Sequence, residues 1–145
     1  MRLVIDTNIV IAALLKDSVT RKILLHPLFS FYIPEHAFNE VANHEKALIK
    51  KSGLTKHRFH EVLSSLKKHL VIVSSEEFIG HYPEAHEAMK DIDETDAPFI
   101  ALALSFDNDG VWTNDSHFEH QILVRMWSTA DLINELKELE EEIHY

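Results

Sequence analysis

Two short apolar runs that lie far apart in the chain each lead into an acidic residue. Residues 3–5 are leucine, valine and isoleucine and stop at Asp6, and residues 111–113 lead through Asn114 to Asp115. In an open α/β sheet, ligands bind outside the carboxyl ends of strands, near the point at which the strand order reverses. If the two runs are neighbouring strands, Asp6 and Asp115 face one crevice. The sequence therefore predicts a site built from carboxylates.

A third acid, Asp96, directly precedes a segment that is apolar all round. Residues 97–104 predict a helix inside the domain rather than on its surface. Asp is a favoured N-cap and Pro98 is tolerated in a first turn, so one interpretation of Asp96 is a helix cap alone. The other interpretation is that Asp96 lines the crevice that Asp6 and Asp115 share.

The elements that must position these acids alternate between strands and helices. Strands are predicted at residues 2–5, 29–33, 70–73, 111–113 and 122–127. Helices are predicted from Asn8, Ser18 and Thr55, at 35–51, 97–104 and 129–142, and as one or two short helices over 76–90, broken near Pro83. The alternation predicts a single α/β domain over residues 1–145, with a mostly parallel five-stranded sheet and helices on both faces.

The composition is that of an ordinary globular protein of one domain, with 145 residues, 46% hydrophobic and 26% charged. The apolar runs are too short to span a bilayer. Met1 is followed at once by an apparent core strand, which leaves no room for a signal peptide, so we expect a cytoplasmic protein. The sequence has no cysteine, which excludes thiolate metal ligands and leaves oxygen and imidazole donors.

The net charge of −10 argues against a passive nucleic-acid binder, which normally presents a basic face. It is compatible with a nuclease whose cations bridge its carboxylates to phosphate. Basic residues group loosely between residues 50 and 69, where we expect a solvated helix face rather than contact with a phosphate backbone.

Four segments of the sequence together resemble the PIN domain family. They are residues 4–8 (VIDTN), 34–40 (PEHAFNE), 96–103 (DAPFIALA) and 113–118 (TNDSHF), which occur in the family's order and cover nearly the whole chain. PIN domains are metal-dependent nucleases, and many small ones are VapC-type toxins of toxin–antitoxin pairs. The resemblance therefore implies an Mg²⁺- or Mn²⁺-dependent endoribonuclease that cleaves single-stranded RNA or unpaired loops, with an antitoxin protein as partner and a homodimer as its assembly.

The resemblance also implies roles for individual residues. The acidic metal ligands and catalytic residues would be Asp6, Glu40, Asp96 and Asp115. Asn8 and Thr113 would orient them by hydrogen bonds, and Asp93 would be an outer ligand or a loop residue. On spacing alone, Glu40 is not distinguished from Glu35 or Glu45. The chain departs from the family at His117, two residues after Asp115, where an acid is common; this departure bears on a second metal position more than on the first.

The chemistry explains why such a site needs carboxylates. Mg²⁺ and Mn²⁺ prefer carboxylate and water oxygens, and a bound ion can lower the pKa of a water while a second ion stabilises the leaving oxygen. By resemblance, the products would carry a 5′-phosphate and a 3′-hydroxyl.

Three other classes compete with this interpretation. A haloacid-dehalogenase-like phosphatase would need a second Asp where Asn8 stands, and a receiver-like domain would need an early adjacent acid pair that residues near Asp6 do not supply. The third is a catalytically silent PIN-fold module that binds protein, which a test of metal-dependent activity would separate from an enzyme. The eleven histidines are scattered through polar stretches, and we expect most of them at the surface.

Overall fold

The computed structural model describes residues 1–15 and 18–144. Its strands are β1 (Arg2–Ile5), β2 (Ser30–Pro34), β3 (Leu70–Val73), β4 (Val111–Trp112) and β5 (Met126–Trp127). Its α-helices are α1 (Thr7–Leu14), α2 (Ser18–Leu24), α3 (His36–Asn43), α4 (Glu45–Ser52), α5 (Lys56–Lys67), α6 (Tyr82–Met89), α7 (Ala97–Leu104) and α8 (Thr129–His144). Short 3-10 helices are η1 (Ser75–Glu77), η2 (Ile79–His81), η3 (Glu94–Asp96) and η4 (Ser116–His120).

The five strands form one parallel sheet in the order β3-β2-β1-β4-β5. The chain runs outward from β1 to β3, then returns to the other side of β1 for β4 and β5. Val4 lies opposite Val111 and Ile5 opposite Trp112, which confirms the predicted pairing of the two strands that lead into acids. The strand order therefore reverses between β1 and β4.

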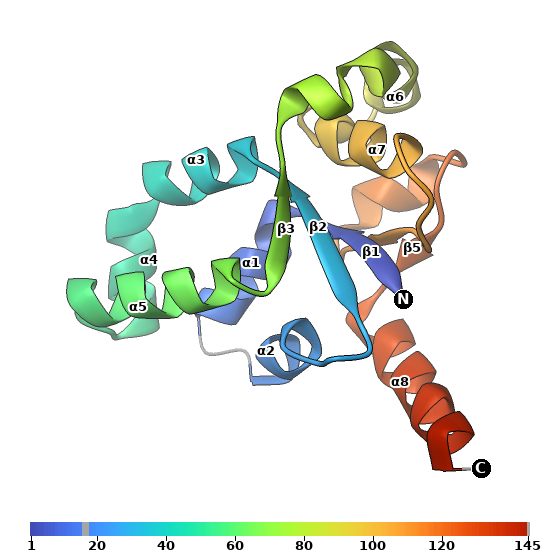
Figure 1. The fold of residues 1–145 in the computed structure, drawn as a ribbon. Helices are drawn as coiled ribbons and strands as arrows, with labels where there is room; N and C mark the ends of the chain where they lie inside the picture. The colour runs from blue at the N-terminus through green and yellow to red at the C-terminus, as the bar shows by residue number, and fades with distance from the viewer. Residues whose placement is uncertain (16–17, 145) are drawn as a thin grey trace.

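Helices cover both sides of the sheet, as predicted (Figure 1). On one side, α1 packs against α2, α3, α4 and α5. On the other, α7 contacts β1, β2 and β4, and α6 packs on α7. Leu3, Val4 and Ile5 of β1 are fully buried between these layers. Such burial on both faces explains why β1 is apolar at successive positions rather than alternating.

The single helix predicted over residues 35–51 is wrong, because the structure divides it into α3 and α4 at His44. The backbone of His44 leaves the helical region at φ −109° and ψ 13°, and its N–H donates to the Val41 carbonyl instead of continuing the helix. This turn lets Val41 and Leu48 both reach the core, where each is buried. No glycine or proline marks the break, so the sequence gives no local signal for it.

The break predicted near Pro83 lies between His81 and Tyr82, where η2 ends and α6 begins, which confirms it to within two residues. Pro83 occupies the first turn of α6, where its missing N–H costs no helical hydrogen bond, and the irregular part is the pair of 3-10 helices η1 and η2 before it. Other helix ends are as predicted: Gly53 ends α4 in the left-handed region at φ 69°, and Thr55 caps α5. Ser128 and Asp131 form a reciprocal capping box at the start of α8.

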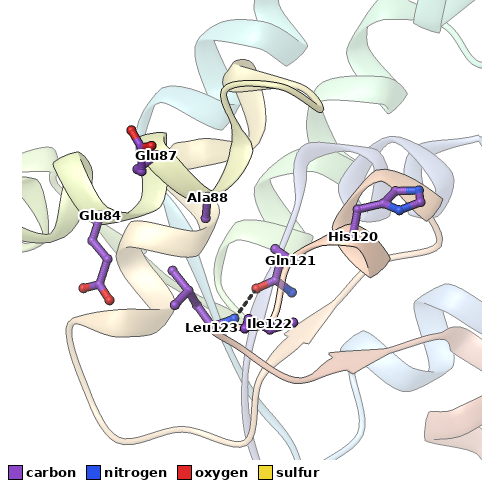
Figure 2. A pocket seen from close by; sticks show the side chains of 7 residues that line it. All are labelled: Glu84, Glu87, Ala88, His120, Gln121, Ile122 and Leu123. Carbon is purple, nitrogen blue, oxygen red and sulfur yellow. Dashed lines mark hydrogen bonds between the residues drawn. The ribbon is translucent and has the colours of Figure 1, made fainter.

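The fifth strand is much shorter than the predicted 122–127. The Gln121 side chain accepts hydrogen bonds from the amides of Leu123 and Val124 and donates to the carbonyls of Phe118 and Val124. Figure 2 shows the Gln121–Leu123 bond. These bonds occupy backbone groups of Leu123 and Val124 that a strand could present to β4. Bonding to β4 therefore begins only at the Arg125 carbonyl, which accepts from the Val111 amide, and β5 begins at Met126. Ile122, predicted in the strand, is 97% exposed.

Candidate functional site

A cavity of about 160 Å³ opens beyond the carboxyl ends of β1 and β4, at the reversal of strand order. Its walls are Asp6, Thr7, Asn8, Glu40, Asp93, Thr95, Asp96, Phe99 and Asp115. The structure thus brings six of the seven residues singled out from the sequence to one cavity. The seventh, Thr113, does not line the cavity, but its hydroxyl donates a hydrogen bond to Asp6, which does. Five carboxylates lie around this small space.

Asp6 is the most deeply buried of the five carboxylates, with 3% of the residue exposed. It ends β1 and caps α1, because its Oδ1 accepts a hydrogen bond of 3.1 Å from the Ile9 amide. Burial raises the pKa of Asp6 to about 6, with a smaller increase from Asp115, while the hydrogen bonds from Thr113 and Ile9 oppose the shift. The metal-free site therefore disfavours a negative charge on this residue.

Thr113 links the two strand-end acids. Its hydroxyl donates to Asp6 Oδ2 at 2.5 Å and accepts from the Asp115 amide at 3.0 Å. Because β1 and β4 are adjacent, this one buried side chain fixes the Asp6 carboxylate relative to the backbone that carries Asp115. Asp115 in turn caps η4, since its Oδ1 accepts from the His117 amide at 2.9 Å.

Asp96 stands at the N-cap position of α7, but its carboxylate makes no capping hydrogen bond. Its own backbone is helical, at φ −86° and ψ −10°, because α7 continues directly from η3. Among the described residues, Asp96 Oδ2 is buried and has no hydrogen-bond partner. The interpretation of Asp96 as a cap alone is therefore wrong.

The pKa of Asp96 is raised to about 7, mainly by burial and further by the nearby charges of Asp93, Asp115 and Asp6. Asp93 behaves differently, because Thr95 holds its Oδ1 with the side-chain hydroxyl at 2.6 Å and the amide at 3.1 Å. These bonds lower the pKa of Asp93. The surroundings thus favour the ionised form of Asp93 and disfavour the ionised form of Asp96. A nearby cation would favour ionisation of Asp96.

Glu40 reaches the cavity from the second turn of α3, and its Oε1 lies 3.2 Å from His36 Nε2. The other two glutamates that spacing could not distinguish lie elsewhere. Glu35 is exposed ahead of α3, and Glu45 pairs with His60 at 2.6 Å. The fold, not the spacing, separates Glu40 from them.

His117, in η4, turns its ring toward the same acids. Its Nδ1 lies 3.4 Å from Asp115 Oδ1, 3.5 Å from Asp93 Oδ2 and 3.9 Å from Asp96 Oδ2. Each of Asp93, Asp96 and His117 can offer a ligand atom such that all three atoms lie within 4.8 Å of one another. An imidazole therefore joins the carboxylates at the more exposed side of the cavity.

Asn8 lines the cavity, but within residues 1–15 and 18–144 its side chain makes no hydrogen bond to the acids. Three further wall residues were missed from the sequence: Thr7, Thr95 and Phe99. Phe99 lies one helical turn after Asp96, a spacing that could have indicated a shared face. Thr95 two residues after Asp93 is a typical side-chain turn. The Thr7 hydroxyl, which is buried without a hydrogen-bond partner among the described residues, had no signal in the sequence.

The donor set fits a divalent metal ion. Carboxylate oxygens are the ligands that hard cations prefer, and the buried, unpartnered Asp96 Oδ2 is a donor that the described protein groups leave free. Bringing a cation to this cavity would also relieve the repulsion that raises the pKa values of Asp6 and Asp96. The residues present therefore suit an acidic metal site.

A larger hollow of about 400 Å³ lies between α6 and residues 120–123 (Figure 2). Glu84 and Glu87 border it from α6, and His120 borders it from the far side. The figure shows the two glutamates on one side of the hollow and His120 well away from them on the other. This arrangement does not gather donors as the acidic cavity does.

A family model described as PIN domain matches residues 4–137 of the 145-residue chain. No curated protein matches the sequence. None of the helices in the described part of the chain has the length and apolar character that crossing a membrane requires.

Proposed function

The chain belongs to the PIN domain family, and from that premise we propose that it is an endoribonuclease that hydrolyses RNA phosphodiester bonds with Mg²⁺ or Mn²⁺. The observation that carries the proposal is the meeting of Asp6, Glu40, Asp96 and Asp115 at one small cavity where the strand order reverses. These four would be the metal ligands and catalytic residues. Thr113 and Asp93 would support them, and Asn8 would contribute as part of the cavity wall.

The residues of the chain would prepare the site in distinct ways. Thr113 keeps the Asp6 carboxylate and the Asp115 backbone in a fixed relation, and Thr95 keeps the Asp93 carboxylate oriented. The free Oδ2 of Asp96 would complete the ligand set. A bound divalent ion supplies a water of lowered pKa and a positive charge opposite the phosphate. The protein's part is to hold these donors in place.

Unpaired RNA is the substrate that such a cavity favours. A recessed site of about 160 Å³ admits a phosphate on a single strand or a loop more readily than one within a rigid duplex. The net charge of −10 means that the protein itself repels the RNA backbone at long range, so productive binding would depend on the metal. A cytoplasmic location fits an RNA substrate and a chain without cysteine.

The family resemblance supports a more specific role, as the toxin of a VapBC-type pair that is held inactive by an antitoxin protein and acts as a homodimer. Co-expression with the product of the adjacent reading frame, followed by size-exclusion chromatography of the complex, tests this role. A neighbouring frame without a binding partner, or a partner that leaves RNA cleavage unchanged, would contradict it.

The nuclease proposal is tested by cleavage of end-labelled RNA. Single-stranded RNA should be cut in Mg²⁺ or Mn²⁺, spared in excess EDTA, and converted to products with 5′-phosphate and 3′-hydroxyl ends. Asp96→Asn should abolish cleavage, whereas Asp107→Asn makes the same chemical change at an exposed position beyond the far end of α7 and should not. Cleavage that persists in EDTA, or in Asp96→Asn, would count against the proposal. A parent that binds metal without cleaving RNA would favour a silent binding module.

A further inference from the structure

The position at which this chain departs from its family, His117, points into the site rather than away from it. Its Nδ1 is the ring atom nearest the acids, at 3.4 Å from Asp115, 3.5 Å from Asp93 and 3.9 Å from Asp96. The ring is about half exposed, Asp93 is less so, and Asp96 has only 14% of its side chain exposed. The three donors therefore form a wall that runs from the surface into the cavity.

The distances between His117 Nδ1 and the carboxylate oxygens are typical of atoms that bind the same metal ion. Two ligands at about 2.1 Å from one cation are about 3.0 Å apart at right angles, about 3.4 Å apart at the tetrahedral angle and about 4.2 Å apart when opposite. The distances from His117 Nδ1 to the facing oxygens of Asp93 and Asp96 lie within this range. Little movement of the side chains would be needed for an ion to join them.

The facing oxygens are also the ones that remain available. Asp93 uses Oδ1 to accept from Thr95 and turns Oδ2 toward His117. Asp96 Oδ2 is buried without a hydrogen-bond partner among the described residues. Thr95 therefore acts as an outer partner that orients one ligand, and the backbone bond from His117 to Asp115 Oδ1 anchors the segment that carries the imidazole.

We propose that His117 Nδ1, with Asp93 and Asp96, forms a metal position that prefers Mn²⁺ to Mg²⁺. This inference rests on the proposed function and specifies the ion that serves it. Imidazole is a ligand for the later first-row divalent ions, whereas Mg²⁺ selects oxygen and holds its waters tightly. Mn²⁺ accepts carboxylate oxygen and imidazole nitrogen together, so a mixed donor set favours Mn²⁺ over Mg²⁺ more strongly than an all-carboxylate site does.

The direct test is electron spin-echo spectroscopy of Mn²⁺ added to the metal-free, full-length protein. The parent should show modulation from a directly bound imidazole nitrogen. His117→Ala should lose that modulation. His36→Ala should keep it, which separates His117 from the other histidine beside an acid of the cavity, since His36 contacts Glu40 at 3.2 Å.

Calorimetry then measures the preference. In His117→Asp, the ratio of the Mg²⁺ to the Mn²⁺ dissociation constant should fall about tenfold or more. The added carboxylate oxygen strengthens Mg²⁺ binding more than Mn²⁺ binding, and changes around a metal ligand alter affinity by about 10- to 100-fold. His120→Ala removes an imidazole from the same 3-10 helix at the hollow of Figure 2 and should leave the ratio unchanged.

Three outcomes decide between the ideas. Mn²⁺ bound with nitrogen modulation that depends on His117 supports the inference. Mn²⁺ bound without nitrogen modulation, or a ratio that His117→Asp leaves unchanged, overturns it while leaving the proposed nuclease intact. A parent that binds neither ion overturns both the inference and the proposed function. Circular dichroism of each variant shows whether a loss of binding reflects a loss of fold.

Discussion

The acids of the cavity differ in what their surroundings do to them, and this has a measurable consequence for pH. Burial holds the pKa of Asp6 at about 6 and that of Asp96 at about 7 in the metal-free protein. In the unfolded chain both would titrate near the ordinary value of about 3.9. Between the pKa of the unfolded chain, about 3.9, and the raised pKa values of the folded protein, the folded state binds more protons than the unfolded state. Stability therefore falls as the pH rises through this window.

We expect the free energy of unfolding in EDTA to decrease between about pH 4 and about pH 7, and the contribution of these two groups to level off above pH 7. Urea unfolding followed by circular dichroism at several pH values checks this. Asp96→Asn should flatten the upper part of the decrease. If the free energy of unfolding of Asp96→Asn decreased between pH 6 and pH 7 as steeply as that of the parent, the Asp96 carboxyl would not be the cause of the decrease.

Thr113 is the residue through which the two strand-end acids act together. Replacing its hydroxyl in Thr113→Val removes the bond to Asp6 Oδ2 and the acceptor for the Asp115 amide while keeping the volume. We expect metal affinity to fall about 10- to 100-fold, as for other outer partners of metal ligands. Isothermal titration calorimetry with Mn²⁺ measures the loss.

Thr55→Val is the matched control for Thr113→Val. It removes a threonine hydroxyl that caps α5 by accepting from the Arg58 amide, away from the cavity. The variant should lose about 0.5 to 2 kcal/mol of stability and bind Mn²⁺ as the parent does. If the two variants lost metal affinity equally, Thr113→Val would act by lowering the stability of the fold and not by changing the orientation of the Asp6 carboxylate.

At the scale of elements, Gln121 replaces strand pairing with side-chain hydrogen bonds. Its amide bonds to four backbone groups between Phe118 and Val124, which is why residues 122–124 lie outside the sheet. In Gln121→Ala, we expect a loss of about 1 to 3 kcal/mol, because one buried and three part-buried hydrogen bonds to the backbone would be lost. Amide hydrogen exchange at Leu123 and Val124 should accelerate more than exchange in β1. Uniform acceleration across the sheet would instead indicate global unfolding.

The elements also show what the sequence could and could not predict. β1 was recognisable because a central parallel strand is apolar at successive positions, and the Ser128–Asp131 capping box was recognisable from its three-residue spacing. The break at His44 was not, since it results from where Val41 and Leu48 must pack rather than from a local breaker. β5 was overestimated because apolar residues there do not reveal which backbone groups Gln121 will occupy.

The same contrast applies to the candidate site. The strand-end acids could be predicted, because strand pairing brings the ends of β1 and β4 together whatever the loops do. That Asp96 leaves its helix uncapped, and that His117 turns toward it, depends on the path of the loops through η3 and η4. Such paths are set by tertiary contacts that no spacing in the sequence encodes.

At the scale of the whole molecule, the proposed metal site would link folding to metal binding. Asp6 and Asp96 reach it from different parts of the chain, and Asp115 ends the strand that pairs with β1. Folding therefore brings like charges together, and a cation that bound only the folded state would compensate them. Without metal, repulsion between these acids should lower the free energy of unfolding of the protein.

Asp96→Asn tests this link, because the substitution removes one charge and little else. Asn is as good a cap as Asp, and Asp96 makes no side-chain capping bond, so no helix effect is expected. In EDTA the variant should be more stable than the parent by up to about 2 kcal/mol, since about 1.4 kcal/mol corresponds to each pKa unit of repulsion relieved. In Mn²⁺ at about 100 times its dissociation constant the parent gains about 2.7 kcal/mol, which the variant largely loses, so the order of stability should reverse.

Melting curves of both proteins with and without Mn²⁺, beside Asp107→Asn as a charge control, measure this reversal. An equal metal-induced shift in parent and Asp96→Asn would remove Asp96 from the metal site, whatever the RNA cleavage assay showed.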